Sequence, residues 1–323
     1  MTKLTSNIYS GGDSTALSRY FDKVVLESLL PNTYILGAGT QKTLPKGQNK
    51  YVFSLATKTV GTVAGLTLSE GTTPNEGSWA MEQQEVSLTQ IGEHIYISDV
   101  VLSDSPVEVI ANALSDIAMN VAAVADILVQ DVIDAGTNVY YSGDASARNN
   151  VSSNDTLSAS NISKAQAILL ANNAKPYDAG MFMGVIHPHV LHDLRIETGT
   201  GAWLDANKYV TPEKIFKGEI GALSGVRIVV SPNIQFYANA SNGSGGTGNI
   251  DVYPTYFFGK DAFGVVRDGE PQSIFKPLGS GGTEDPLNQR ASAGVKFRVG
   301  ATILRENALV RFESYSTLGA NAS

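Results

Sequence analysis

The sequence of 323 residues contains no cysteine. This absence excludes disulfide bonds, thiolate zinc sites and a cysteine nucleophile. Histidine is scarce as well, at four residues, which limits any metal site built from imidazoles. The chain is not poor in apolar residues: a hydrophobic content of 42% is enough to bury the core of one large domain or two small ones.

Clustered positive charge is also lacking. The chain has 23 Lys and Arg against 31 Asp and Glu, a net charge of −8, and no run of basic residues. Proteins that coat nucleic acid through its phosphates need such clusters, so we expect no direct, sequence-specific binding to a genome. Residues 1–14 lack the apolar core of a secretion signal, and we expect folding in a cytoplasm.

One long helix is the clearest element that the sequence does contain. Residues 105–136 are rich in Val, Ile, Leu and Ala, without Gly or Pro after the first turn. Ser105 as N-cap, Pro106 at the first position and Glu108 in a capping box mark its start, and Gly136 suits a left-handed stop. At 1.5 Å per residue the helix would be roughly 45 Å long.

The polar residues of this helix fall within less than half of its circumference. They are Glu108, Asn112, Ser115, Asp116, Asn120, Asp126, Gln130, Asp131 and Asp134. A membrane-spanning helix would not keep charges along its length, and a coiled coil would have a narrower apolar seam with charges of both signs. The pattern therefore predicts a helix lying across a sheet or a partner, with one wet acidic face.

Two segments before this helix lack a core of their own. Residues 1–49 read as an extended arm with one short helix candidate at 13–30, and residues 50–98 as a long hairpin with a bulge near Gly92. An isolated two-stranded ribbon is marginal in water, so the hairpin needs a neighbour. The residues expected to make such contacts between subunits are Tyr20, Phe21, Tyr51, Phe53, Leu66, Leu68 and Trp79.

The second half of the chain alternates helices and strands irregularly, which predicts an α+β fold rather than a doubly wound one. The helix candidates are 162–172 and 188–196, and residues 239–249 form a flexible insertion. The strand candidates are 181–186, 226–230, 253–258, 263–266, 295–304 and 309–315, the last two joined by a turn at RENA.

The strongest enzymatic candidate is HPHVLHDL, with His187, His189, His192 and Asp193. Side chains of this kind could ligate a metal for a hydrolase. The alternative is structural: Pro188 begins a helix, and the imidazoles pack or hydrogen-bond at a strand–helix corner. The glycine stretches GAGT and GSGGTE lack a following Gly-Lys-Ser/Thr, and no nucleophile elbow or HExxH helix occurs. We expect no enzyme and no cofactor.

The order of arm, hairpin, long helix, α+β region and final strands resembles the major capsid protein of tailed bacteriophages, the Hong Kong 97-type fold. Three stretches are similar to the podovirus N-four-like coat family in particular. They are GVIHPHVLHDLRIETGTGAWLD at 184–205, GEIGALSGVRIVVSPN at 218–233, and KPLGSGGTEDPLNQRASAGVKFRVGATILRENALVRFES at 276–314.

The resemblance implies a division of the chain into five parts. These are an N-terminal arm at 1–49, an extended hairpin loop at 50–98, a peripheral domain with a spine helix at 99–160, an axial domain at 161–289, and returning strands of the peripheral domain at 290–323. In some relatives a lysine of the extended loop is cross-linked to an asparagine. Lys50 and Lys58 lie near the base of this loop, but no motif identifies such a pair.

The resemblance also implies the partners and the location. Copies of the chain would form hexamers and pentamers of an icosahedral shell around double-stranded DNA, assembled in the host cytoplasm around a scaffolding protein, with a portal and a possible decoration protein. The acidic residues Glu108, Asp116, Asp126, Asp131 and Asp134 would face the lumen and keep DNA from the wall. The alternatives are another virion protein, of the tail or of a decoration, or a metal-dependent hydrolase that uses His187, His189 and His192.

Overall fold

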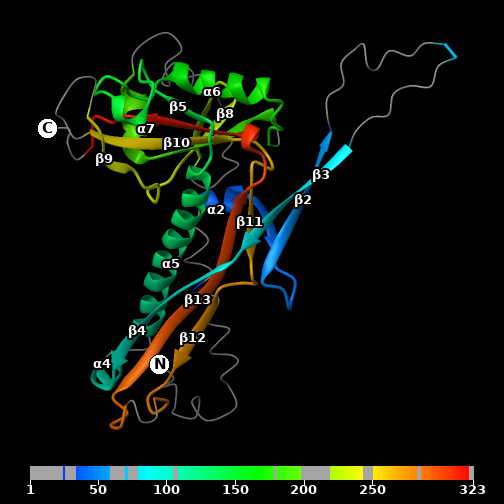
Figure 1. Ribbon diagram of the computed structural model, residues 1–323. Helices are drawn as coiled ribbons and strands as arrows, with labels where there is room; N and C mark the ends of the chain where they lie inside the picture. The colour runs from blue at the N-terminus through cyan, green and yellow to red at the C-terminus, as the bar shows by residue number, and fades with distance from the viewer. Residues whose placement is uncertain are drawn as a thin grey trace.

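The computed structural model describes residue 25 and residues 34–58, 70–71, 79–104, 108–177, 180–197, 219–242, 250–281 and 285–319. Within these ranges the chain is a mixed α and β structure with three sheets. Figure 1 shows an elongated part in which α5 lies beside long strands, a seven-stranded sheet with its helices at one end of it, and a hairpin that projects to the side. No helix among the described residues is long and apolar enough to cross a membrane.

The elongated part is a five-stranded sheet built around β13. Its strands are β1 (Thr40–Thr43), β4 (Thr89–Ser98), β11 (Phe263–Arg267), β12 (Gln272–Lys276) and β13 (Arg290–Ile303). β4 pairs with the first ten residues of β13. β12 pairs with β13 at residues 292–296, and β11 pairs with it at residues 299–303. β1 is added in parallel to β11.

One face of this sheet packs against α5 (Glu108–Asp134). Alternate residues of β13, from Ala293 to Val299, and Ile97 of β4 are buried there with Leu114, Val121 and other apolar residues of the helix. Strand residues alternate between the two faces, so the same pattern exposes Tyr96 and Lys296 on the opposite face. The short helix α4 (Asp99–Asp104) leads from β4 towards α5.

The seven-stranded sheet has the order β5-β14-β10-β6-β8-β7, with β9 also paired to β10. The strands are β5 (Val139–Tyr141), β6 (Phe182–Ile186), β7 (Glu219–Leu223), β8 (Val226–Val230), β9 (Tyr237–Ser241), β10 (Ile250–Phe258) and β14 (Leu309–Ser314). Helices α6 (Ala159–Ala171) and α7 (Pro188–Ile196) cover one face, with Phe257 and Phe312 in that core. Tyr256 and Phe258 face the other way and join the core of α5.

The hairpin is shorter than its sequence pattern suggested. It consists of β2 (Lys50–Lys58) and β3 (Trp79–Ser87), paired with Lys50 opposite Ser87 and Lys58 opposite Trp79. The chain leaves this ribbon at Leu88 and enters the five-stranded sheet as β4. The ladder of β4 is regular at Gly92, which lies opposite Lys296, so the bulge predicted there is wrong. The change of phase marks a change of sheet.

The last two strands are joined at the predicted turn. β13 and β14 are separated by the short 3-10 helix Glu306–Ala308 and lie in different sheets. β14 is paired with β10 and β5 of the seven-stranded sheet, while β11 and β12 belong to the five-stranded sheet. Each of the two larger sheets thus contains strands from both sides of residue 289, and the predicted division into domains stays a prediction.

The base of the hairpin is packed against its own subunit. Phe53 is 7% exposed and joins Val86, Val266 and Leu304 in a small core. A methyl group on Gly264 would lie 2.6 Å from Phe53 Cζ, so the absence of a side chain there makes room for the ring. Phe53 thus packs within its own subunit, and the predicted contact of this residue between subunits stays a prediction.

Replacing Phe53 by alanine should lower the free energy of unfolding of the isolated subunit by about 3 kcal/mol, because it removes a buried ring and leaves a cavity. Val52 is 41% exposed on the opposite face of the ribbon, and Val52→Ala is the matched control, with an expected loss below about 1 kcal/mol. Urea titration of both variants measures the difference. Equal losses would show that Phe53 is not part of a packed core.

Candidate functional site

Buried polar side chains on α5 connect the helix to other parts of the chain. Asp126 is 1% exposed, and its carboxylate accepts hydrogen bonds from the backbone N–H groups of Tyr34 at 2.8 Å and Leu36 at 2.9 Å. These are the residues around the start of the short helix α2 (Ile35–Ala38). Asp126 therefore acts as a cap supplied from a distant helix, and it holds the chain at 34–36 against α5.

One and two turns further along α5, Gln130 and Asp134 contact the region of the seven-stranded sheet. The Gln130 amide donates to the Gln235 carbonyl oxygen and to Tyr256 Oη, both at 2.9 Å, and its oxygen accepts from the Gln235 N–H at 2.8 Å. Tyr256 Oη donates to Asp134 at 2.6 Å. Burial raises the pKa of Tyr256 well above its usual value, and the charge of Asp134 adds to this effect. The phenol is therefore a hydrogen-bond donor at neutral pH.

The network continues through two arginines. Arg311 on β14 donates to the Asp134 carbonyl oxygen at 2.6 Å and lies 3.0 Å from the carboxylate of Glu313. Glu313 has no exposed surface and accepts two hydrogen bonds from Arg148, at 2.8 and 2.5 Å. The Arg148 guanidinium lies 3.6 Å from the ring centre of Tyr237, and its bonds with Glu313 raise its pKa further above the usual range. Removing one partner of such a buried ion pair lowers the free energy of unfolding by about 3–5 kcal/mol.

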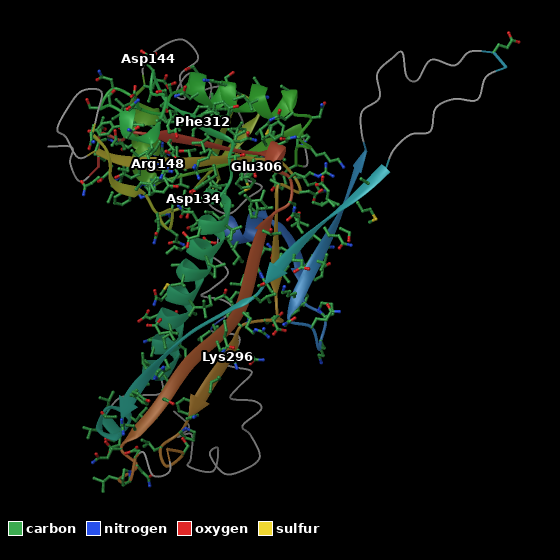
Figure 2. The ribbon with its side chains drawn as sticks, viewed as in Figure 1. Asp134, Asp144, Arg148, Lys296, Glu306 and Phe312 are labelled. Atoms are coloured by element: carbon green, nitrogen blue, oxygen red, sulfur yellow. The ribbon has the colours of Figure 1, made fainter. Side chains whose placement is uncertain are left out.

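The end of α5 is held by a carboxylate from the β13–β14 connection. Glu306 accepts hydrogen bonds from the N–H and hydroxyl groups of Thr137 and from the N–H of Asn138. α5 ends just before Gly136, as predicted, but this glycine is not in the left-handed region, so the predicted conformation is wrong. Its role is close packing: a Cβ there would lie 3.2 Å from Glu306 Oε1 and 3.3 Å from Leu309 Cδ2. Figure 2 shows Asp134 and Glu306 near the end of α5.

The predicted acidic stripe is therefore divided by the tertiary structure. Asp116 and Asp131 are exposed, as predicted. Asp126 is instead buried, and the half-buried Asp134 bonds to Tyr256 within the subunit. The lumen-facing position of the stripe stays a prediction. The side chain of Glu108 lies outside the described residues.

The predicted contact residues of the arm and hairpin are only partly described. Tyr51 is half-buried, and its ring packs edge-on to Phe53 with 4.9 Å between ring centres. Trp79 begins β3, but its side chain lies outside the description. The four remaining predicted contacts also lie outside the described residues, namely Tyr20, Phe21, Leu66 and Leu68. They stay predictions.

The histidine cluster has structural contacts. His187 is the N-cap of α7 and accepts a hydrogen bond from the His189 N–H, while His189 Nδ1 lies 3.1 Å from Tyr253 Oη. Burial, helped by the nearby His189, lowers the pKa of His187 to about 4, so its ring is neutral at pH 7. Asp193 accepts hydrogen bonds from Thr317. The described residues contain no group of three His, Asp or Glu side chains that could hold a metal ion.

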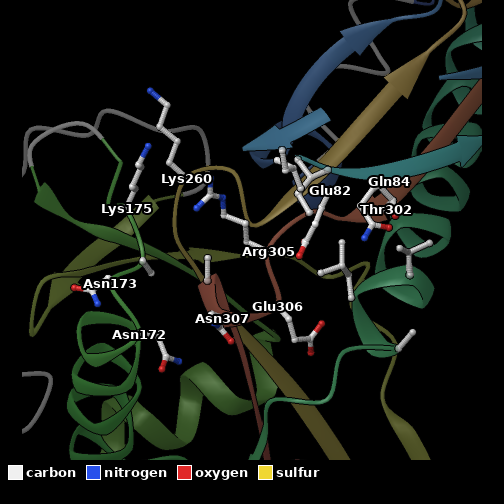
Figure 3. A pocket seen from close by; sticks show the side chains of 17 residues that line it. Glu82, Gln84, Asn172, Asn173, Lys175, Lys260, Thr302, Arg305, Glu306 and Asn307 are labelled. Atoms are coloured by element: carbon white, nitrogen blue, oxygen red, sulfur yellow. The ribbon is translucent and has the colours of Figure 1, made fainter. Parts of the chain in front are cut away.

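A cleft of about 650 Å³ lies between the hairpin and the seven-stranded sheet (Figure 3). Its walls come from β2 and β3, the end of α5, the end of α6 and the β13–β14 connection. The lining is mainly polar and includes Lys175, Lys260 and Arg305, with Glu82 and Glu306. No nucleophile with a neighbouring base is present among these lining residues.

Comparison with known proteins identifies the family. The model of the family described as phage capsid protein matches residues 81–312, more than half of the chain. The chain belongs to the phage capsid protein family. No curated protein sequence matches this capsid protein. Its family implies a structural role.

Solved capsids share the fold of this capsid protein. The capsid of Ralstonia phage GP4 has a TM-score of 0.67 with 14% sequence identity, covering 88% of each chain. The capsid of Helicobacter pylori bacteriophage KHP30 has a TM-score of 0.64 with 11% identity, covering 89% of this chain and 90% of that one. For cyanophage Pam1 the values are 0.63 and 15%, with 90% and 93% covered. The Hong Kong 97-type α+β fold is thus confirmed, and the N-four-like subfamily stays a prediction.

Sequence reasoning missed the buried network of this capsid protein. Arg148 is more than 160 residues from Arg311 and Glu313 along the chain, and no spacing pattern relates it to them. The one signal was local: Arg311 and Glu313 alternate with Val310 and Phe312 in an otherwise apolar strand. Charged side chains that alternate with apolar ones indicate a strand with one apolar face and one polar face, and the charges of a buried polar face need partners of opposite charge.

Protonation of Asp126 gives a pH-dependent prediction. Burial raises the pKa of its carboxyl, against the opposing effect of hydrogen bonds from the backbone at 34–36. A carboxyl with a raised pKa in the folded state contributes stability below its ordinary pKa of 3.8, and this contribution is lost as the pH rises through the folded-state pKa. The free energy of unfolding of the wild type, minus that of Asp126→Asn, should therefore fall as the pH rises from about 4.

Urea titrations of both proteins between pH 4 and 8 measure this difference, and its slope is at most about 1.4 kcal/mol per pH unit. Asp116→Asn is the matched control, because Asp116 is exposed on the same helix and should give a nearly flat difference. A difference that increases with pH for Asp126→Asn would contradict the raised pKa.

Proposed function

We propose that this protein forms the shell of a tailed-bacteriophage head by self-assembly, and that the β2–β3 hairpin of each copy overlaps an adjacent copy. The main support for this proposal is the position of the hairpin. It projects from the rest of the described chain (Figure 1), and its two strands pair with each other and with no third described strand. Such a ribbon is marginal in water without a surface to lie on.

The side chains of the hairpin support this proposal. One face packs at its base against the subunit through Phe53 and Val86, as described above. The opposite face carries Val52 at 41% and Met81 at 54% exposure, beside an exposed ion pair of Lys50 with Glu85 at 3.0 Å. Apolar side chains on the exposed face of a ribbon are buried at little cost when a second copy covers them.

The two larger sheets suggest how one copy is placed in the shell. We assign α5 and the five-stranded sheet to a peripheral domain and the seven-stranded sheet with α6 and α7 to an axial domain near the symmetry axes of hexamers and pentamers. A scaffolding protein, a portal and a possible decoration protein are proposed partners, and the assembled virion enclosing double-stranded DNA is the proposed location. Assembly in the host cytoplasm belongs to the same proposal.

Negative-stain microscopy of the protein expressed in bacteria tests this function. We expect closed polyhedral shells or ring-shaped capsomers, whereas tubes or small isolated oligomers would favour a tail or decoration protein. Because Lys58 and Trp79 lie directly opposite each other, residues 59–78 can be replaced by an Asn-Gly turn without stretching the strands.

This shortened variant should fold as a subunit, with an unchanged circular dichroism spectrum, and should form no shells. The control removes residues 243–249, a segment of Gly, Ser, Asn and Thr distant in sequence from the hairpin, and should leave assembly unchanged. Normal shells from the shortened hairpin would overturn the overlap between copies.

The exposed acids of α5 give a second test within this proposal. We place Asp116 and Asp131 on the lumen side, where their charge limits adhesion of the packaged DNA. The double variant Asp116→Lys and Asp131→Lys should slow DNA packaging at low salt, measured as the fraction of DNA-filled heads. The double Asn variant, which removes charge without reversing it, should package almost normally. Unchanged packaging by the Lys variant would contradict the lumen position.

A further inference from the structure

Three basic side chains lie together at the edge of the cleft shown in Figure 3. Lys175, Lys260 and Arg305 line it and are all exposed, and in the figure they rise on the same side. Backbone bonds fix their positions: the Lys260 N–H donates to the Lys175 carbonyl oxygen at 2.7 Å, and the Arg305 N–H donates to the Ala262 carbonyl oxygen at 3.0 Å. The three residues are called the basic notch below.

The basic notch brings three positive charges to one cleft, which Glu82 also lines. None of its three side chains forms an ion pair with a carboxylate in the described part of the chain. Glu306, on another wall of the cleft, is engaged with Thr137 and Asn138. Three cations that line one cleft and form no ion pair within the described part of the chain favour an acidic occupant.

A segment of the chain itself has the complementary character. Residues 59–78, which connect β2 to β3, contain Glu70 and Glu76 and no Lys or Arg. The described pair Glu70–Gly71 lies at the far end of the hairpin in Figure 1, away from the body that carries the cleft. This described pair thus lies away from the basic notch of its own copy, and another copy can bring its own Glu70 to that notch.

We propose that the basic notch of one copy receives the acidic hairpin end, residues 59–78, of a second copy. The proposal rests on the overlap between copies proposed above and names the receiving surface. Copies with a charge of −8 repel one another, and a contact between local opposite charges offsets this repulsion where the copies meet. It also fixes direction, because the acidic end of each hairpin fits a notch and not another hairpin.

A second basic surface competes for the same occupant. Lys276 and Lys296 flank a trough of about 550 Å³ on the open face of the five-stranded sheet, together with Tyr96 and Ile274. Figure 2 shows Lys296 in the lower part of this sheet, far from Glu306 of the cleft. We favour the notch because it gathers three cations rather than two. Lys276 and Lys296 supply the matched control.

Charge reversal tests the proposal. The variants Lys175→Glu/Lys260→Glu and Glu70→Lys/Glu76→Lys should each raise the subunit concentration needed for assembly by about tenfold, equivalent to about 1.4 kcal/mol per contact. The effect should shrink in 0.5 M salt, because salt screens exposed charges. Lys276→Glu/Lys296→Glu should change assembly much less.

Mixing decides whether the contact is between copies. An equimolar mixture of the two reversed variants should assemble better than either alone, because the hairpin of each then matches the notch of the other. A single chain carrying all four reversals should also regain assembly. Failure of both rescues, or a larger effect of the Lys276/Lys296 control than of the notch variant, would overturn the proposal.

A cysteine pair measures the contact directly. The chain has no cysteine, so Glu70→Cys with Lys260→Cys gives disulfide-linked multimers on a non-reducing gel only if these positions meet. Glu70→Cys with Lys296→Cys is the control pair. If the wild type forms shells and only the control pair becomes cross-linked, the notch is rejected and the shell function stands. If the wild type forms no oligomer at all, the shell function itself is rejected.

Discussion

The buried charged and polar groups along α5 determine how the two larger sheets are related. Burying a carboxylate is costly unless hydrogen bonds or opposite charges compensate it. Asp126 is compensated by backbone N–H groups at 34–36, and Glu313 by Arg148 and Arg311. These bonds are directional, so they fix an orientation that apolar packing alone would leave looser. For a subunit that repeats in a closed shell, a fixed relation between its two parts is a physical requirement.

The connection between β13 and β14 links the end of α5 to the cleft. Arg305 lines the cleft, and its neighbour Glu306 caps the chain after α5. A contact made by Arg305 in the basic notch would therefore lie one residue from Glu306, which binds the chain just after α5. The hairpin, in contrast, is attached through the small core of Phe53 and through close backbone approach at Gly264 and Gly300.

Much of the secondary structure could be predicted because it follows from local periodicity. The helices at 108–134, 159–171 and 188–196 and the buried strands of the second half agree closely with the patterns of their residues. Sheet membership could not be predicted in this way. The slip of phase at 88–92 is a true signal, but alternation within a strand does not say which sheet it joins.

The sequence by itself determined the fold class, the long helix and the side of it on which the polar residues lie, since these depend on neighbours along the chain. At about 100° per residue, Asp116 and Asp134 point in the same direction from the helix axis. Only the tertiary structure decided that Asp116 meets solvent while Asp134 meets Tyr256 and Arg311. Burial depends on segments more than 120 residues away, and helical periodicity carries no information about them.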